Sequence, residues 1–402
     1  MNLYTLQKKV KSDIEDVAEF WLKNGFDREH GGVYTCLDRK GNVYSTDKSV
    51  WMQGRCGWTF SRLCNLYGMR KQWIEFADSC ISFVDEYCKN RTAGDRMYFS
   101  VTGDGKPLRQ RRYSFSEAFY VMACAEYYKA TGDTARLYEA RKYYELIYKL
   151  NNKLIDDPVG LPPKTDIETR SGRALSPTMI YLNMSRVMYD CDPDNAELYL
   201  KRASESADII LKYHFKPELE VTLENVGPNG EFYRDYTDGR HINPGHAIEC
   251  AWFLMEHADL THDDDMMGKA VKMMEFAVKK GWDEEYGGLL YFSDALGLPR
   301  ETCEHDMKLW WPHNELAIAS LMAYMHSRSQ EHLKLFEKNC DYAFRVFGDD
   351  EYGEWYGYLR RDGKPTEPTT KGTLYKGPFH LPRMLMMLDG MLDKILSGGG
   401  ET

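Results

Sequence analysis

The stretch between residues 72 and 132 decides the fold. It reads "QWIEFADSCISFVDEYCK" (72–89), then "MYFSVTGDGKP" (97–107), then "SEAFYVMACAEYYKATG" (116–132). The first and third segments place apolar residues at intervals of three and four, which is typical of amphipathic helices. The middle segment alternates aromatic and β-branched residues before a Gly-containing turn, which predicts a short β-hairpin. One unit is therefore a helix, a hairpin-like loop and a second helix.

Segments like the middle one recur along the chain. They are "HGGVYTCLDRKG" from His30, "YGGLLYFSDALGLP" from Tyr286, "YGEWYGYLRRDGKP" from Tyr352 and a looser copy, "GEFYRDYTDGR", from Gly230. Their spacing is about 65 residues or a near multiple of it, which indicates a repeat architecture. Six such units fit the 402 residues. The helical periodicity predicts an all-α fold. One helical hairpin cannot bury both of its faces alone, so we expect the six to close into a ring. Six hairpins close into an (α/α)6 barrel, with short β-hairpin loops gathered at one end.

The rest of the chain fits one domain. No Pro-, Gly- or Ser-rich linker divides it, so we expect a single domain over 1–395, followed by a flexible tail, "LSGGGET" (396–402). The net charge of −10 argues against nucleic acid or an anionic membrane as the main partner, because both require clustered Lys and Arg. No apolar run approaches the roughly 18 residues of a membrane span.

The N-terminus and the cysteines point to the cytoplasm. "MNLYTLQKKVKSDIEDV" is charged from the start and lacks the apolar core of a signal peptide. The ten cysteines form no CxxC and no Cys/His cluster with the spacing of zinc ligands. We therefore expect reduced core cysteines in a cytoplasmic protein, and we predict no metal site.

Three histidines share an unusual context. His246 lies in "NPGHAIECAWFL", His313 in "WWPHNELAIASL" and His380 in "KGPFHLPRMLMML", each just after Gly, Pro or a Pro-containing turn and before an apolar helical run. The helix dipole at such a position lowers the pKa of histidine and favours a neutral base. Each histidine could instead only cap its helix or pack against it. Three histidines at matching positions of a ring would all point at its centre, which favours a shared site.

Two carboxylates and an arginine accompany them. Glu249 is three residues after His246 and shares its helix face, and Glu315 is two residues after His313. A carboxylate beside an imidazole orients its tautomer, although acidic residues are also common in first helical turns. Arg55 lies in the apolar segment "SVWMQGRCGWTFSRL" and needs a carboxylate or a ligand oxygen as partner. A guanidinium near a carbonyl oxygen stabilises an enolate.

Aromatic residues complete the candidate site. Trp51, Tyr113, Trp310 and Trp311 suit stacking against sugar faces, with core packing as the alternative for each. The sequence has no GxGxxG or Walker-type phosphate loop, no HExxH and no GxSxG. These residues predict an acid/base site in an aromatic-lined cup.

Long segments resemble the N-acylglucosamine 2-epimerase family, which includes the renin-binding protein. They are "GGVYTCLDRKG", "WMQGRCGWTFSRL", "YFSVTGDGKPLRQRRYSFSEAFYVMA", "GRHINPGHAIECAWFL", "HDMKLWWPHNELAIASLM" and "KGPFHLPRML", in order over residues 30–385. The resemblance implies an (α/α)6 barrel that interconverts N-acetylglucosamine and N-acetylmannosamine. The reaction removes the proton at C2 of the ring-opened sugar and returns it to the opposite face.

The resemblance also implies roles for the residues. His246 and His380 are the proton-handling pair, and Arg55 holds the C1 oxygen as negative charge develops on it. Glu315 and Glu249 orient or assist the histidines. His313 is a weaker member of the set, a hydrogen-bonding neighbour of the substrate. The resemblance implies no required cofactor. Animal members of the family are activated by ATP without consuming it, so ATP is an expected activator. A homodimer is a further expectation from the family.

Other functions stay open at this point. Cellobiose 2-epimerases and aldose–ketose isomerases resemble this family, and we expect in the cellobiose enzymes a further histidine in the helix aligned with "LSPTMIYLNMSRVM" (175–188). Met179 and Tyr181 stand there without a histidine, which favours an N-acyl sugar. A glycoside hydrolase or lyase on a similar barrel needs two flanking carboxylates. A non-catalytic protease-binding protein would be free to lose the histidines and Arg55, and all of them are present.

Overall fold

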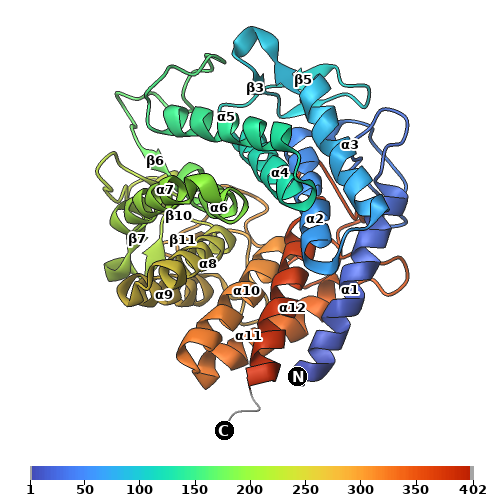
Figure 1. Cartoon of the computed structure of the whole chain (residues 1–402). Coiled ribbons are helices and arrows are strands. Elements are labelled where there is room, and N and C mark those ends of the chain that lie inside the picture. The colour runs from blue at the N-terminus through green and yellow to red at the C-terminus, as the bar shows by residue number, and fades with distance from the viewer. Residues whose placement is uncertain (1, 399–402) are drawn as a thin grey trace.

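The computed structural model describes residues 2–398 (Figure 1). Its α-helices are α1 (Leu3–Asn24), α2 (Val50–Tyr67), α3 (Lys71–Tyr87), α4 (Phe115–Thr131), α5 (Thr134–Asn151), α6 (Leu175–Cys191), α7 (Ala196–Ile209), α8 (Pro244–Thr261), α9 (Asp264–Gly281), α10 (Trp310–Ser327), α11 (Gln330–Phe347) and α12 (His380–Gly398). Short helical turns are η1 (Arg91–Ala93), η2 (Pro193–Asn195), η3 (Ile210–His214), η4 (Pro217–Leu219) and η5 (Asp238–Arg240).

The strands are only two or three residues long. They are β1 (Lys48–Ser49), β2 (Lys89–Asn90), β3 (Arg96–Met97), β4 (Ser100–Val101), β5 (Pro107–Arg109), β6 (Arg173–Ala174), β7 (Phe215–Lys216), β8 (Val221–Thr222), β9 (Asn225–Val226), β10 (His241–Ile242), β11 (Ser293–Asp294), β12 (Lys308–Leu309) and β13 (Tyr358–Leu359).

The even-numbered helices form a closed inner ring. Each of α2, α4, α6, α8, α10 and α12 contacts the next, and α12 closes onto α2. The odd-numbered helices lie outside, each against an inner helix, with α1 packed on α12 (Figure 1). Helices α4, α8 and α10 are buried on most sides, whereas α9 and α11 bury one face, as inner and outer layers require. The predicted (α/α)6 barrel is confirmed.

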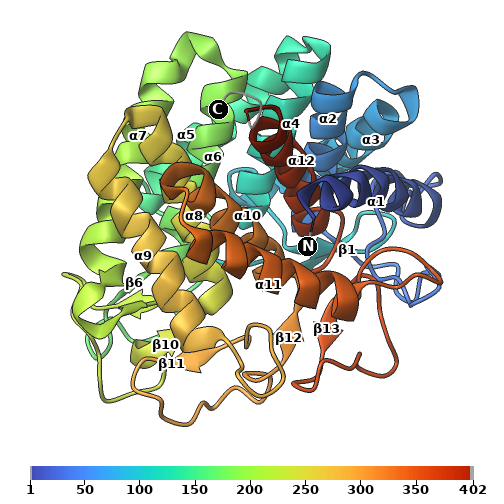
Figure 2. The ribbon, with the colours of Figure 1, turned by 90° about the horizontal axis from the view of Figure 1, so that it is seen from below.

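The strands pair mainly in a different way from the predicted hairpins. Of the five predicted hairpin segments, all within residues 2–398, only 97–107 supplies a pair of strands, β4 with β5. Two further local pairs, β2 with β3 and β7 with β8, lie just after α3 and η3. Elsewhere the strand before an inner helix pairs with the loop after the outer helix that follows: β1 with β4, β6 with β9, β10 with β11 and β12 with β13. Isolated hairpins are marginal in water. This longer-range pairing instead ties the entry of each inner helix to a loop, and β10 to β13 lie at one end of the barrel (Figure 2).

A buried lysine–aspartate pair recurs in three of these loops. In each, an aspartate just after an outer helix accepts from a lysine with an unexposed side chain. The pairs are Lys48–Asp27 at 2.6 Å, Lys308–Asp283 at 2.9 Å and Lys371–Asp349 at 2.8 Å. These ion pairs fix the loops at the end of the barrel where the inner helices begin.

Removing one of these cations destabilises the fold. Lys48 Nζ also donates to the carbonyl oxygens of Gly31 and Gly103, at 2.7 and 2.8 Å. Because Lys48→Met leaves Asp27 buried without this cation, we expect the free energy of unfolding in urea to fall by about 3 kcal/mol. The exposed Lys106→Met is the control, with a change of about 0.5 kcal/mol or less. Equal losses in the two variants would contradict a structural role for the buried pair.

The C-terminal helix extends further than predicted. Residues 396–398 belong to α12 rather than to a tail, and 399–402 lie outside the described residues. Within residues 2–398, no helix combines the length and apolar character needed to cross a membrane. All ten cysteines are free, and only Cys303 is exposed.

Candidate active site

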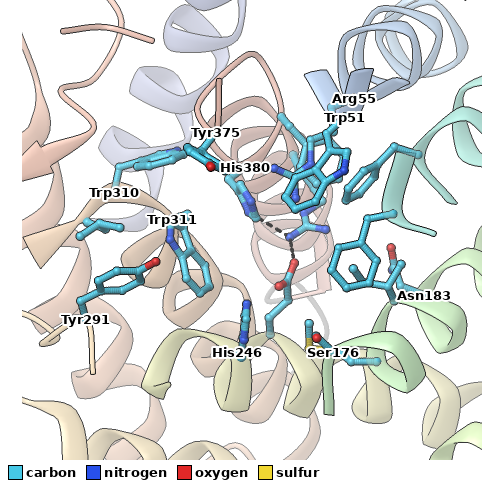
Figure 3. A pocket seen from close by; sticks show the side chains of 18 of the residues that line it. Trp51, Arg55, Ser176, Asn183, His246, Tyr291, Trp310, Trp311, Tyr375 and His380 are labelled. Atoms are coloured by element: carbon cyan, nitrogen blue, oxygen red, sulfur yellow. Dashed lines mark hydrogen bonds and ion pairs between the residues drawn. The ribbon is translucent and has the colours of Figure 1, made fainter. Parts of the chain in front are cut away.

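A cavity of about 430 Å³ opens in the centre of the ring (Figure 3). Its walls come from the inner helices, from Tyr358 of β13 and from the loops that carry Tyr291 and Tyr375. The polar side chains of the cavity stand mainly near the N-terminal ends of the inner helices. The side chain of Asn243, for example, caps α8 by accepting from the backbone N–H of His246 at 3.2 Å. His380 is the first residue of α12.

His380 forms a hydrogen bond with a buried carboxylate. Its Nδ1–H donates to Glu315 Oε1 at 2.7 Å, so Nε2 keeps its lone pair. Glu315 also accepts from Trp252 Nε1 at 2.7 Å and from Arg383 Nη2 at 2.8 Å. Burial, together with the positive charges of Arg55 and Arg383, holds the pKa of His380 well below its usual value. His380 is therefore a neutral imidazole suited to accept a proton.

Arg383 joins two carboxylates beneath the cavity. Its Nη2 donates to Glu249 Oε1 at 2.5 Å as well as to Glu315. Among the described residues, Glu249, Glu315 and His380 are near enough to one another to hold a metal ion. The guanidinium already bonds to both carboxylates and supplies positive charge at that place. Sequence reasoning missed Arg383, although it stands three residues after His380 on one helix face and, like Arg55, within an apolar run.

His246 has a different carboxylate from the expected one. Its Nδ1–H donates to Glu224 Oε1 at 2.9 Å, whereas Glu249, the predicted partner, bonds to Arg383. Burial lowers the pKa of His246, but the charge and hydrogen bond of Glu224 outweigh it and raise the pKa above its usual value. The predicted lowering at helix starts is therefore wrong for His246. Glu224 lies in a loop far from His246 in sequence, and no local pattern marks it.

Arg55 lines the cavity between two aromatic rings. Within residues 2–398 its guanidinium makes no hydrogen bond or ion pair, and it lies 4.1 Å from the ring centre of Phe119 and 4.6 Å from that of Phe379. Burial lowers its pKa to about 9. An unpaired guanidinium in an aromatic-lined cavity is available to a ligand oxygen.

Three of the predicted aromatic residues line the cavity, namely Trp51, Trp310 and Trp311. The ring centre of Trp311 lies 5.2 Å from that of His246 and 5.6 Å from that of His380, so this indole touches both imidazoles (Figure 3). Trp311 therefore forms the part of the cavity wall between the two histidines, and both imidazoles border the same cavity.

Two predicted substrate contacts lie elsewhere. His313 is fully buried behind the wall: its Nδ1–H donates to the carbonyl of Leu309 at 2.7 Å, and its Nε2 accepts from the N–H of Leu289 at 2.9 Å. Burial lowers its pKa to about 3. Both ring nitrogens bond to the backbone, so His313 holds the fold together and does not line the cavity. Tyr113 stacks on Phe115, a lining residue, at 5.1 Å, and does not itself line the cavity.

Comparisons with known proteins agree with this geometry. A family model described as N-acylglucosamine 2-epimerase (GlcNAc 2-epimerase) matches residues 32–377. The chain is 36% identical over 403 aligned positions to the N-acylglucosamine 2-epimerase of Rattus norvegicus, covering 100% of this chain and 95% of that protein. It is 23% identical to the cellobiose 2-epimerase of Bacteroides fragilis, covering 96% and 98%. The cellobiose 2-epimerase of Bacillus thermoamylovorans has the same fold, with a TM-score of 0.82 at 20% identity over 96% and 99% of the chains.

Proposed function

The chain belongs to the N-acylglucosamine 2-epimerase family, and we propose from this premise that it interconverts N-acetylglucosamine and N-acetylmannosamine. One observation carries the proposal. Two imidazoles, each held through Nδ1 by a carboxylate, border the same cavity as an arginine that has no hydrogen-bond or ion-pair partner among residues 2–398. Epimerisation at a carbon beside a carbonyl group needs this set: two proton carriers and a positive charge for the oxygen.

The reaction follows from these groups. In the ring-opened sugar the C2–H bond lies beside the C1 aldehyde. One histidine takes the C2 proton through Nε2, and the electron pair of the broken bond delocalises onto O1. Arg55 stabilises the negative charge on that oxygen. The other histidine, as imidazolium, gives a proton to the opposite face of C2, and the enolate becomes the aldehyde of the second epimer.

The supporting residues orient a histidine, hold its carboxylate or contact the sugar. Glu315 orients His380, and Arg383 bonds to Glu315 and Glu249. Trp51, Trp310 and Trp311 give the sugar apolar faces to stack against. Burial and the charges of Arg55 and Arg383 hold the pKa of His380 low, so the resting imidazole is neutral and its Nε2 has a free lone pair for the C2 proton.

The N-acyl sugar is favoured over unmodified sugars by the relatives and by α6. Identity is 36% to the rat N-acylglucosamine 2-epimerase but 23% to the cellobiose enzyme. The face of α6 that lines the cavity presents Ser176, Met179, Ile180 and Asn183, and no histidine. An epimerase or isomerase of unmodified sugars is the second candidate, because the cellobiose enzymes share the fold.

A glycoside hydrolase fits this cavity less well. Such an enzyme needs one carboxylic acid that is protonated and one carboxylate that is ionised. Glu249 and Glu315 each accept a hydrogen bond at Oε1 from Arg383 Nη2, and Glu315 accepts another at Oε2 from Trp252 Nε1, so both act as acceptors here. Neither is suited to donate a proton to a leaving group.

The proposal is tested with N-acetylmannosamine in D2O, followed by proton NMR. We expect N-acetylglucosamine that carries deuterium at C2, because the returning proton comes from a histidine that exchanges with solvent. The reaction is run with and without ATP, which the proposal includes as a non-consumed activator. Turnover of mannose or cellobiose alone would support the second candidate. No conversion of any of these sugars would support a binding protein.

A cytoplasmic location and a homodimer belong to the same proposal. Ten free cysteines, nine of them buried, suit a reducing compartment. Sedimentation of the purified protein tests the dimer, with a mass of twice 46.8 kDa as the expected result.

A further inference from the structure

Glu224 is held in place by its own backbone. Its N–H donates to the carbonyl of His241 in β10 at 3.2 Å, and its carbonyl accepts from the N–H of Leu175 at the start of α6 at 2.8 Å. The segment therefore ties two loops together beside the cavity. Its side chain is 12% exposed and reaches His246, whose side chain is 30% exposed. A carboxylate fixed in this way points at the imidazole with little freedom to move.

The charge of Glu224 is directed to His246. The other carboxylate, Glu315, shares its charge with Arg383 and Trp252. Within residues 2–398 Glu224 bonds to no lysine or arginine. The histidines that face it are His246, His241 and His214, and Tyr291 and Cys250 also lie near its charge.

The two neighbouring histidines are occupied elsewhere. His241 Nδ1 lies in contact with Arg300, and His214 Nδ1–H donates to the carbonyl of Leu223 at 2.8 Å. Burial lowers the pKa of both, to about 4 for His241. They are therefore neutral near pH 7, and His246 is the histidine left to balance the charge of Glu224.

We propose that Glu224 is the positioning residue of His246 in the epimerisation. It fixes the tautomer that turns Nε2 toward the sugar, and it stabilises the imidazolium that forms when Nε2 holds the C2 proton. This inference rests on the proposed function. It assigns to a loop residue, which no local motif marks, the role that Glu315 has toward His380.

The pH dependence separates this role from a merely structural one. Glu224 and Glu249 raise the pKa of His246, and burial and Arg55 lower it. Glu224→Gln keeps an oxygen that accepts from Nδ1–H but removes the negative charge. We expect the pKa of His246 to fall in this variant while the ring keeps its orientation.

The experiment compares Glu224→Gln and Glu224→Ala with Glu218→Gln, an exposed glutamate of η4 upstream in the same region. kcat/KM is measured against pH in both directions, and the ¹⁵N-labelled imidazole of His246 is titrated by NMR, with His246→Asn to assign its signal. We expect kcat/KM to fall about 10- to 100-fold in Glu224→Gln and further in Glu224→Ala, which also loses the orienting bond. The control stays at the wild-type value.

The shifts of the pH profiles of kcat/KM show whether His246 acts as the acid or as the base in each direction. Where His246 donates the proton, the alkaline limb moves to lower pH in Glu224→Gln. Where His246 accepts it, the acidic limb moves to lower pH. An unchanged His246 titration in Glu224→Gln overturns the inference, even if activity falls. If the wild-type protein converts no sugar, the proposed function fails instead, and the titration still decides whether Glu224 sets the charge of His246.

Discussion

Replacing His380 with asparagine lowers kcat for epimerisation by about 10²- to 10⁴-fold, the range that a positioned acid/base group contributes. The introduced asparagine would still offer an amide N–H to Glu315, so the buried network beneath the cavity keeps a donor. The loss then reports the missing proton carrier. Turnover is measured by proton NMR, with His326→Asn on the exposed end of α10 as the matched control at wild-type activity.

Exchange without conversion gives a sharper result. In D2O, His380→Asn leaves His246 able to take and return the C2 proton on its own face only. We expect one epimer to exchange its C2 proton for deuterium without inversion, and His246→Asn to do the same for the other epimer. Wild-type conversion by either variant, or exchange of the same epimer by both, would contradict the two-base assignment.

The periodicity of the sequence contained most of the fold. Helical periodicity and the recurring aromatic loops predict six hairpins in a ring, because that information is local. The strand pairing was not predictable in this way. β12 and β13 are separated by two whole helices, so their pairing depends on how the barrel closes.

In the site, too, local sequence patterns predicted some features and the three-dimensional arrangement decided the others. His246, His313 and His380 have nearly identical contexts, but they are the third, fourth and first residues of their helices. Since each residue turns a helix by about 100°, one position decides the direction of a side chain. His313 points at Tyr342 of α11, with ring centres 5.3 Å apart, and away from the cavity. Glu224 could be found only in three dimensions, whereas Arg383 carried the same signal as Arg55.

Arg383→Met has the largest effect that we expect on stability, and it also lowers activity. The guanidinium is the cation bonded to Glu249 and Glu315, which are 9% and 0% exposed. Removing it leaves two buried carboxylates side by side, and the loss of one partner from such a network costs about 3–5 kcal/mol of unfolding free energy. Because Glu315 also orients His380, we expect kcat to fall by more than about 10²-fold. Urea unfolding and the NMR assay measure the two effects.

The pH dependence of the loss identifies its cause. Like charges at close range raise the pKa of one carboxylate in the folded variant above its unfolded value. A group with a raised folded pKa stabilises below its unfolded pKa, and this contribution is lost as pH rises through the folded pKa. Arg383→Met should therefore lose more stability at about pH 8 than at about pH 5, and adding Glu249→Gln should restore part of it. Arg70→Met, which breaks an exposed pair with Glu15, should cost only about 0–1 kcal/mol. A loss in Arg383→Met that is independent of pH and unaffected by Glu249→Gln would mean that the arginine acts through packing on Trp252 and Phe379 rather than through charge.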